Sequence, residues 1–171
     1  EDDPDFKGRK AQAGVARYAS LHPTAIDQKV EVIVEHFRRH VSSELDGQAK
    51  AMIVTQSREH ALRYWQRLND YIAAKGYADL KALVAFSGDL ELDDQTWTEE
   101  LANGFAETEL PKRFDTDEYQ ILVVAEKYQT GFDQPKLVAM YADKKLAGLQ
   151  AVQTLARLNR TRGGKDRTFV L

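Results

Sequence analysis

The residues best suited to chemistry lie near the C-terminus, in the one-letter run QTLARLNR from Gln153 to Arg160. At 3.6 residues per turn, a helix would place Gln153, Arg157 and Arg160 on one face. Two fixed guanidiniums suit the binding of a phosphate group, and they could act as arginine fingers in phosphoryl transfer. A face that only meets solvent would show the same pattern. The apolar stripe that would dock this helix on a core consists of Leu149, Val152, Leu155 and Ala156.

The charge of the chain limits how it could bind an anionic partner. The 171 residues carry 24 Lys and Arg against 27 Asp and Glu, a formal net charge of −3. Bulk charge therefore gives no affinity for nucleic acid, and any such contact needs a local basic patch. Residues 157–167 form one, which overlaps the candidate phosphate site, whereas residues 89–100 are acidic.

Several classes of protein are excluded by what the sequence lacks. There is no cysteine, which rules out disulfides and cysteine-based zinc sites. No apolar run reaches the roughly 20 residues needed to span a bilayer, and no signal peptide is present. We therefore expect a cytoplasmic protein without a membrane partner. The start without methionine suggests a fragment of a longer chain.

Short apolar runs alternate with amphipathic segments along the chain, which predicts an α/β fold with a mainly parallel sheet and helices on both faces. The predicted strands are 50–55, 81–86, 119–125, 137–141 and 166–171. The predicted helices are 27–43, 57–76, 97–105, 110–114 and 149–159. Residues 1–25 read as an arm with a short helical stretch at 9–19, and Thr24 as the cap of the first long helix.

Two loops at the carboxyl ends of the first strands could meet an anion, because ligands bind at that edge of a parallel sheet. Ser57 and Arg58 follow the first strand, where helix-terminal N–H groups, a hydroxyl and a guanidinium make an anion site. Ser57 could equally be a simple helix cap. Ser87 and Gly88 follow the second strand, where glycine allows a backbone to approach closely, or simply makes a turn.

A third loop, at 127–135, follows the strongest predicted strand. It places Gly131 next to the hydroxyl of Thr130, and Asp133 could accept a hydrogen bond from a ribose. An ordinary connecting loop would look similar. No phosphate-binding G-x-x-x-x-G-K-[ST] loop and no Asp-Glu pair after a strand occur in the chain. His36 and His40 have metal-ligand spacing but no third ligand, so no metal site is predicted.

The order of these segments resembles motifs IV, IVa, V and VI of superfamily 2 helicases and translocases, over roughly residues 50–171. Three runs resemble the restriction (R) subunit of type I restriction–modification enzymes: KYQTGFDQP at 127–135, MYADKKL at 140–146 and AVQTLARLNR at 151–160. Ala156 departs from the glycine of many members. The resemblance implies a RecA-like second motor domain at 49–171, preceded by an N-terminal arm and linker helix at 1–48 that resemble the segment entering this domain.

The resemblance also implies roles at the nucleotide. Gln153, Arg157 and Arg160 would face ATP bound on a first motor lobe, with Arg160 the foremost finger and Arg157 second. Asp133 would approach the ribose, and Gly131 would allow close packing. ATP and its Mg²⁺ would be held mainly by that first RecA-like domain, which is absent here, so the isolated chain is expected to be inactive.

The DNA-binding residues implied by the resemblance are Ser57, Arg58, Ser87 and Thr130, on the phosphates of one strand. The expected activity is ATP-dependent translocation on double-stranded DNA within a bacterial or archaeal type I restriction endonuclease, with modification and specificity subunits as partners. Two alternatives stay open. One is a lobe of another superfamily 2 helicase, and the other is a non-catalytic nucleotide- or nucleic-acid-binding α/β module.

Overall fold

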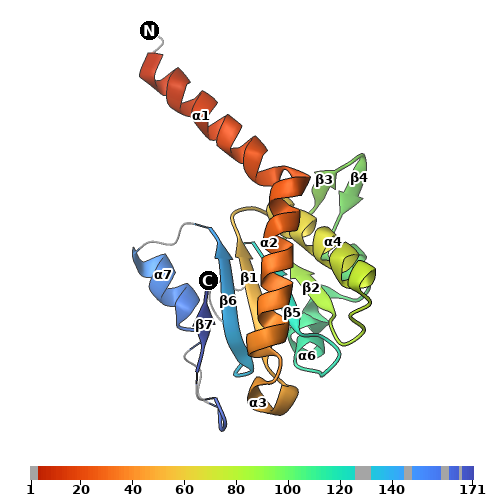
Figure 1. The fold of residues 1–171 in the computed structure, drawn as a ribbon. Helices are drawn as coiled ribbons and strands as arrows, with labels where there is room; N and C mark the ends of the chain where they lie inside the picture. The colour runs from red at the N-terminus through yellow and green to blue at the C-terminus, as the bar shows by residue number, and fades with distance from the viewer. Residues whose placement is uncertain (1–3, 126–131, 145–147, 159–161, 166) are drawn as a thin grey trace.

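A five-stranded parallel sheet forms the centre of the molecule, with the strand order β2-β5-β1-β6-β7 (Figure 1). The computed structural model describes residues 4–125, 132–144, 148–158, 162–165 and 167–171. The predicted α/β fold with a mainly parallel sheet is confirmed. The strands are β1 (Lys50–Thr55), β2 (Ala82–Ala85), β5 (Ile121–Val124), β6 (Leu137–Asp143) and β7 (Phe169–Val170).

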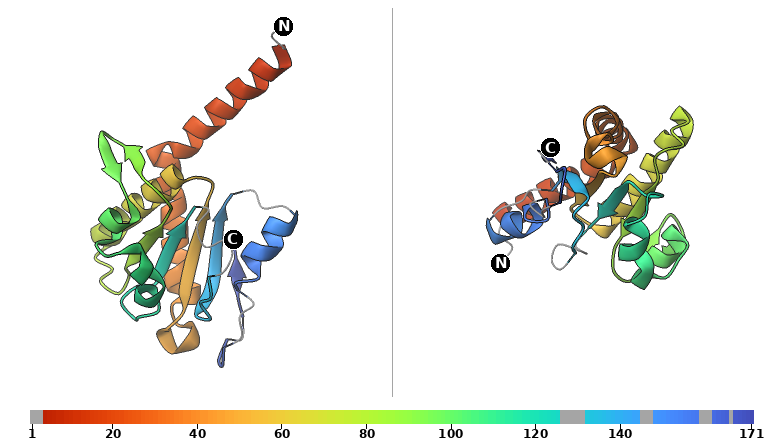
Figure 2. Two further views of the ribbon diagram at one scale, coloured as in Figure 1. Left: turned by 180° about the vertical axis from the view of Figure 1, so that it is seen from behind. Right: turned by 90° about the horizontal axis from the view of Figure 1, so that it is seen from below.

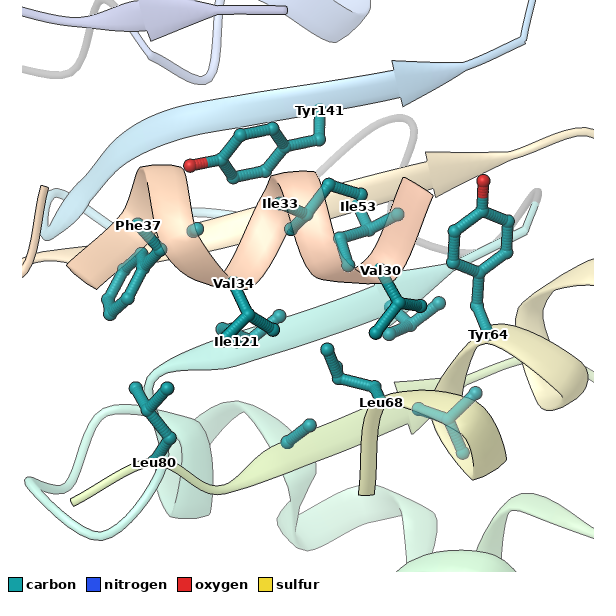
Figure 3. Close-up of a cluster of buried hydrophobic side chains, with 14 of the residues drawn as sticks. Val30, Ile33, Val34, Phe37, Ile53, Tyr64, Leu68, Leu80, Ile121 and Tyr141 are labelled. Carbon is teal, nitrogen blue, oxygen red and sulfur yellow. The ribbon is translucent and has the colours of Figure 1, made fainter. Parts of the chain in front are cut away.

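Successive residues of a strand point to opposite sides of the sheet, so each face carries apolar side chains that must be covered. In β1, Ala51 and Ile53 join a core beneath two long helices, while Met52 and Val54 join a second core on the other face. Figure 3 shows the first core. The helices over it are α2 (Pro23–His36), which continues as a π-helical turn η1 (Phe37–Val41), and α4 (Arg58–Lys75). The second core is closed by α6 (Leu110–Phe114) and the end of α7 (Gly148–Leu155).

The N-terminal arm is more helical than the sequence indicated. Helix α1 (Pro4–Leu21) extends beyond the predicted stretch at 9–19 and projects away from the body (Figure 1; Figure 2, left). The prediction of Thr24 as the cap of α2 is wrong, since the Nδ1 atom of His22 accepts a hydrogen bond of 3.2 Å from the Thr24 N–H. Helix α1 ends at Leu21, and Pro23 begins α2, because the first helical position needs no N–H donor.

Helix α2 lies within the domain core, although the sequence assigned it to a linker. Arg67 of α4 binds the carboxylate of Asp27 through two hydrogen bonds, one of them 2.5 Å from Nε. This contact lowers the pKa of Asp27. Ile26 and Val30 on the same helix are fully buried. Hydrophobic contact and a bidentate ion pair therefore hold α2 against α4.

The acidic segment contains a β-hairpin that the sequence did not indicate. Strands β3 (Leu90–Leu92) and β4 (Gln95–Trp97) are joined at Asp93 and Asp94, whose φ angles of 52° and 61° make a tight hairpin turn. The helix predicted at 97–105 is the shorter α5 (Glu99–Asn103). Its Asn103 side chain bonds the N–H and C=O of Val84, which blunts the exposed edge of β2. Two further short elements are α3 (Glu44–Gly47) and η2 (Glu107–Glu109).

A buried lysine begins the central strand. Lys50 is 2% exposed, and its ammonium group donates to the carbonyl oxygens of Thr116, at 2.6 Å, and Tyr119. Burial, helped by the nearby charge of Lys136, lowers the pKa of Lys50 to about 8. The ammonium thus ties the turn before β5 to the start of β1, at the cost of a buried charge.

The free energy of unfolding should depend on the protonation of Lys50. Its folded pKa of about 8 lies below its ordinary value of 10.5. The unfolded chain therefore binds more protons between these values, and the stability contributed by this residue rises with pH across that window. Urea unfolding of the wild type and Lys50→Met between pH 7 and 10 should show a stability difference that shifts toward the wild type as pH rises. Lys112→Met, which removes an exposed lysine, is the matched control. A pH-independent difference for Lys50→Met would contradict the prediction.

Candidate nucleotide and nucleic-acid interface

The carboxyl ends of β1 and β2 are joined by one arginine. The Nη1 atom of Arg58 donates to the backbone oxygens of Ser87, at 3.0 Å, and Asp89, at 2.8 Å. Gly88 lies between these acceptors with φ of +74°, and a Cβ atom there would be 3.4 Å from Nη1. The structure thus brings together three of the predicted DNA contacts, Ser57, Arg58 and Ser87, at one edge of the sheet.

Ser57 caps helix α4, which was the simpler of the two interpretations of this residue. Its Oγ accepts the N–H of His60 at 3.1 Å and lies 2.6 Å from Nδ1 of the same residue. On the other side of the ring, Nε2 lies 2.8 Å from Oγ of Ser20, whose hydroxyl hydrogen is directed to the Arg17 carbonyl. Ser20 must therefore accept from Nε2–H, which leaves Nδ1 to accept the hydroxyl hydrogen of Ser57.

His60 is a site residue that the sequence reasoning missed. It is fully buried, and burial, followed by the nearby charge of Arg17, lowers its pKa. It connects the arm at Ser20 with the start of α4 at Ser57. The sequence signal for this contact is a histidine three residues after a serine helix cap. A side chain at that position lies close enough to hydrogen-bond the side chain of the cap residue.

The end of the third loop is described from Phe132 onward, and Thr130 and Gly131 lie outside the described residues. Asp133 is exposed. Its neighbours Phe132 and Gln134 are 4% and 3% exposed. The Gln134 amide donates to Asp115 at 3.0 Å, and its oxygen accepts the Lys136 N–H at 3.0 Å. These two buried side chains fix the chain on either side of Asp133. Neither was predicted from the sequence as a site residue.

The expectation that Gln153 and Arg157 share a helix face is wrong. Helix α7 ends at Leu155, and residues 156–158 form a turn. Gln153 is exposed on the helix, whereas Arg157 is 4% exposed and lies beside Leu158, which belongs to the second core. Arg160, the foremost finger in the sequence-based prediction, lies outside the described residues.

The apolar stripe predicted to dock this helix is also wrong. Leu149 and Val152 are 71% and 66% exposed, and Ala156 is exposed too. Of the four residues, Leu155 is partly buried and packs on the second core. Thr154 of this helix is a buried polar residue, at 1% exposure. The helix therefore contacts the sheet mainly through its last turn and the turn that follows.

Of the two histidines with metal-ligand spacing, His36 packs on the core and His40 is exposed. Nδ1 of His36 is 2.7 Å from the hydroxyl of Tyr141, and its ring packs edge-on against Phe169. Within the described part of the chain, no three His, Asp or Glu side chains gather to hold a metal ion. No helix among those residues is long and apolar enough to cross a lipid bilayer.

Sequence comparison relates the chain to type I restriction enzymes. The family model described as type I restriction enzyme subunit R domain 3 matches residues 93–169. Two relatives from Methanocaldococcus jannaschii are named as type I restriction enzyme endonuclease subunits. The first, MjaVIIP, is 27% identical over 85% of this chain and 14% of its own length. The second, MjaIXP, is 30% identical over 75% of this chain and 12% of its own length.

Solved structures share the fold. The type ISP restriction–modification enzyme LlaBIII, solved bound to DNA, superposes with a TM-score of 0.57 and 18% identity, over 85% of this chain and 9% of that one. The Lhr helicase of Mycobacterium smegmatis gives a TM-score of 0.53 and 14% identity, over 86% and 16%. The chain therefore has the fold of a RecA-like helicase domain. It is a relative of the R subunits of type I restriction enzymes, which confirms the resemblance, and it spans about one-seventh of the curated relatives' length.

The hydrogen bonds around His60 predict its tautomer and its titration. The neutral ring should carry its proton on Nε2, and its pKa should lie below 6.5. Because the folded value is below the unfolded one, the stability that His60 contributes is complete above pH 6.5 and is lost as pH falls. Long-range ¹H–¹⁵N NMR spectra between pH 5 and 8 measure both properties. Ser20→Ala should populate the second tautomer, whereas Ser42→Ala, remote from the ring, should not. An Nδ1–H tautomer in the wild type would contradict the assignment.

Proposed function

We propose that this chain is a motor lobe of an ATP-dependent translocase that moves on double-stranded DNA within a type I restriction endonuclease. The observation that carries the proposal is the edge at which Arg58 joins the ends of β1 and β2. The positions expected to contact DNA phosphates meet there. The relatives named as restriction endonuclease subunits support the same assignment.

The chemistry of this edge suits a phosphate backbone. The two hydrogens of Nη1 on Arg58 are taken by carbonyl oxygens, while Nε and Nη2 make no hydrogen bond within the described part of the chain. An exposed guanidinium held in this way can present its remaining donors to phosphate oxygens. Ser87 and Gly88 are also exposed, so a DNA strand can approach their backbone. We propose that Thr130 completes this contact. The hydroxyl hydrogen of Ser57 is directed to His60, so Ser57 would act through its backbone N–H or by positioning Arg58.

The nucleotide would be shared with a first motor lobe. No phosphate-binding loop occurs in this chain, and the described carboxylates form no metal site, so that lobe would hold ATP and Mg²⁺. We propose that Arg160 supplies a cation to the γ-phosphate, with Arg157 and Gln153 beside it. Since Arg157 is buried against the second core, it would hold the turn that presents Arg160 unless lobe closure exposes it. Asp133 would bind the ribose, and Gly131 would allow close packing.

This arrangement links hydrolysis to movement. Guanidiniums fixed on this lobe neutralise charge that develops on the transferred phosphoryl group. They reach the nucleotide when the two lobes close, and the lobes open after hydrolysis. Because Arg58 and the loop at Ser87 are fixed to β1 and β2, closure would shift the DNA contact as one rigid edge. Repeated cycles would move the lobe along the duplex, within a complex that also contains modification and specificity subunits.

The role of Arg160 is testable in the parent chain assembled with its partners. Arg160→Ala should lower DNA-stimulated ATP hydrolysis by about 10³-fold or more, with ATP binding largely retained, because an arginine finger acts in the transition state. Arg162→Ala is the matched control, since the Arg162 guanidinium binds Gln48 within this domain. Turnover that is unchanged in Arg160→Ala would favour a non-catalytic binding module. Stimulation by RNA rather than DNA would favour another superfamily 2 helicase.

The isolated 171-residue chain should bind DNA weakly, without sequence preference and with strong dependence on salt, because phosphate contacts carry no base readout. Arg58→Gln should weaken this binding. Arg113→Gln, at the opposite edge of the sheet, should have a smaller effect. The chain alone should hydrolyse no ATP. Fluorescence anisotropy with labelled duplexes and a phosphate-release assay make these measurements. Tight binding to one sequence at physiological salt, or turnover by the pure chain, would refute this part of the proposal.

A further inference from the structure

The side chains of Ser20, His60 and Ser57 form a chain of hydrogen bonds from the last turn of α1 to the first turn of α4. Nε2 of His60 lies 2.8 Å from Oγ of Ser20, and Nδ1 lies 2.6 Å from Oγ of Ser57. His60 is fully buried, whereas Ser57 is partly exposed and directly precedes Arg58. One end of this hydrogen-bond chain therefore lies at the candidate DNA contacts, and the other end lies in the arm.

The hydroxyl and ring hydrogens of these side chains are all used inside the domain. The Ser20 hydroxyl donates to the Arg17 carbonyl at 2.8 Å, so its Oγ accepts from Nε2–H of His60. Nδ1 then carries no hydrogen and accepts the hydroxyl hydrogen of Ser57. The Ser57 Oγ also accepts the backbone N–H of His60 at 3.1 Å. In this arrangement the Ser57 hydroxyl has no hydrogen to offer a phosphate group.

A second arrangement of the same side chains is available, because a neutral imidazole can carry its hydrogen on either nitrogen. Burial lowers the pKa of His60, which keeps the ring neutral near pH 7. A hydrogen on Nδ1 is donated to Oγ of Ser57, and the hydroxyl hydrogen of Ser57 is then free to point to solvent. Nε2 becomes an acceptor, which the Ser20 hydroxyl satisfies by leaving the Arg17 carbonyl. The charge of the ring does not change, since one proton leaves Nε2 and another joins Nδ1.

The arm favours the first arrangement, and a phosphate group favours the second. With Ser20 beside the ring, the first arrangement gives every donor an acceptor within the protein, whereas the second needs an outside acceptor for Ser57. A phosphate oxygen is such an acceptor, and a hydrogen bond to an ionised oxygen is stronger than one to a neutral group. Arg17, in the same turn as Ser20, also pairs with Glu59 of α4 at 3.0 Å. The contact of α1 with α4 and the binding of a phosphate are therefore coupled, and each opposes the other.

We propose that Ser57 is a switched phosphate contact, which the arm α1 controls through Ser20 and His60. This proposal rests on the proposed DNA-binding function of the carboxyl edge and assigns its regulation to the arm. A movement of α1 that takes Ser20 away from His60 frees the Ser57 hydroxyl to donate to a DNA strand bound by Arg58. Conversely, a strand that accepts this hydroxyl hydrogen weakens the hold of His60 on Ser20.

The tautomer of His60 is the direct measurement of this switch. Long-range ¹H–¹⁵N NMR spectra of the 171-residue chain at neutral pH should show Nε2–H without DNA. The population should shift toward Nδ1–H as a short duplex of arbitrary sequence is added. Ser20→Ala should carry its hydrogen on Nδ1 already without DNA. A ring that keeps its hydrogen on Nε2 at saturating duplex would overturn the proposal.

The affinity for the same duplex tests the role of the Ser57 hydroxyl. Ser20→Ala should bind about threefold to tenfold more tightly than the wild type, as expected for one added hydrogen bond. The slope of log affinity against log salt should not change, because a hydroxyl carries no charge. The double variant Ser20→Ala/Ser57→Ala should bind no more tightly than Ser57→Ala. Ser42→Ala is the matched control, since it removes another helix hydroxyl that donates to a backbone carbonyl, and its affinity should equal that of the wild type.

These measurements separate the switch from the function on which it rests. An affinity of Ser20→Ala no higher than that of the wild type, with binding still sensitive to Arg58→Gln, would overturn the switch and keep the carboxyl edge. A gain that persists when Ser57 is replaced by alanine would do the same. Absence of DNA binding by the wild type would overturn both proposals.

Discussion

The position of β1 in the middle of the sheet is the constraint on which the rest of the structure depends. β1 pairs with β5 on one side and β6 on the other, and all of its residues are buried. Its end therefore fixes where α4 begins and which strand ends lie beside it. The Thr55 hydroxyl, which donates to the Val124 carbonyl at 2.9 Å, joins the ends of β1 and β5 at this edge. Every candidate contact of the carboxyl edge is placed relative to this strand.

Around β1, several polar side chains bond to other helices, strands and loops of the domain. Arg58 joins two loops, His60 joins the arm to α4, and Asp143 accepts from Lys29 at 2.7 Å and Tyr64 at 2.5 Å. The last contact ties the end of β6 to α2 and α4. A group that moved at this edge would move with the helices behind it.

The segment formed by α7 and the turn at Arg157 differs from this edge in which side chains it exposes. Helix α7 exposes Leu149 and Val152, and the turn after it buries Arg157, the reverse of a helix that completes its own domain. An exposed apolar face beside cations suits a surface that meets another part of a larger protein. This agrees with the proposal of a nucleotide shared with a second domain, and with a relative about six times the length of this chain.

The sequence alone determined the strands, the helix that starts after Ser57 and the order of the motifs, because these depend on local periodicity and capping. It did not determine the hairpin at Asp93, the length of α1 or the direction in which Arg157 points. Such features involve contacts between residues far apart in the chain, for example Ser20 with His60 at the end of α1 and Arg63 with Asp93 at the hairpin. A pattern of spacing states which residues could share a face, but only the packed sheet decides where a helix stops and which side of it is buried.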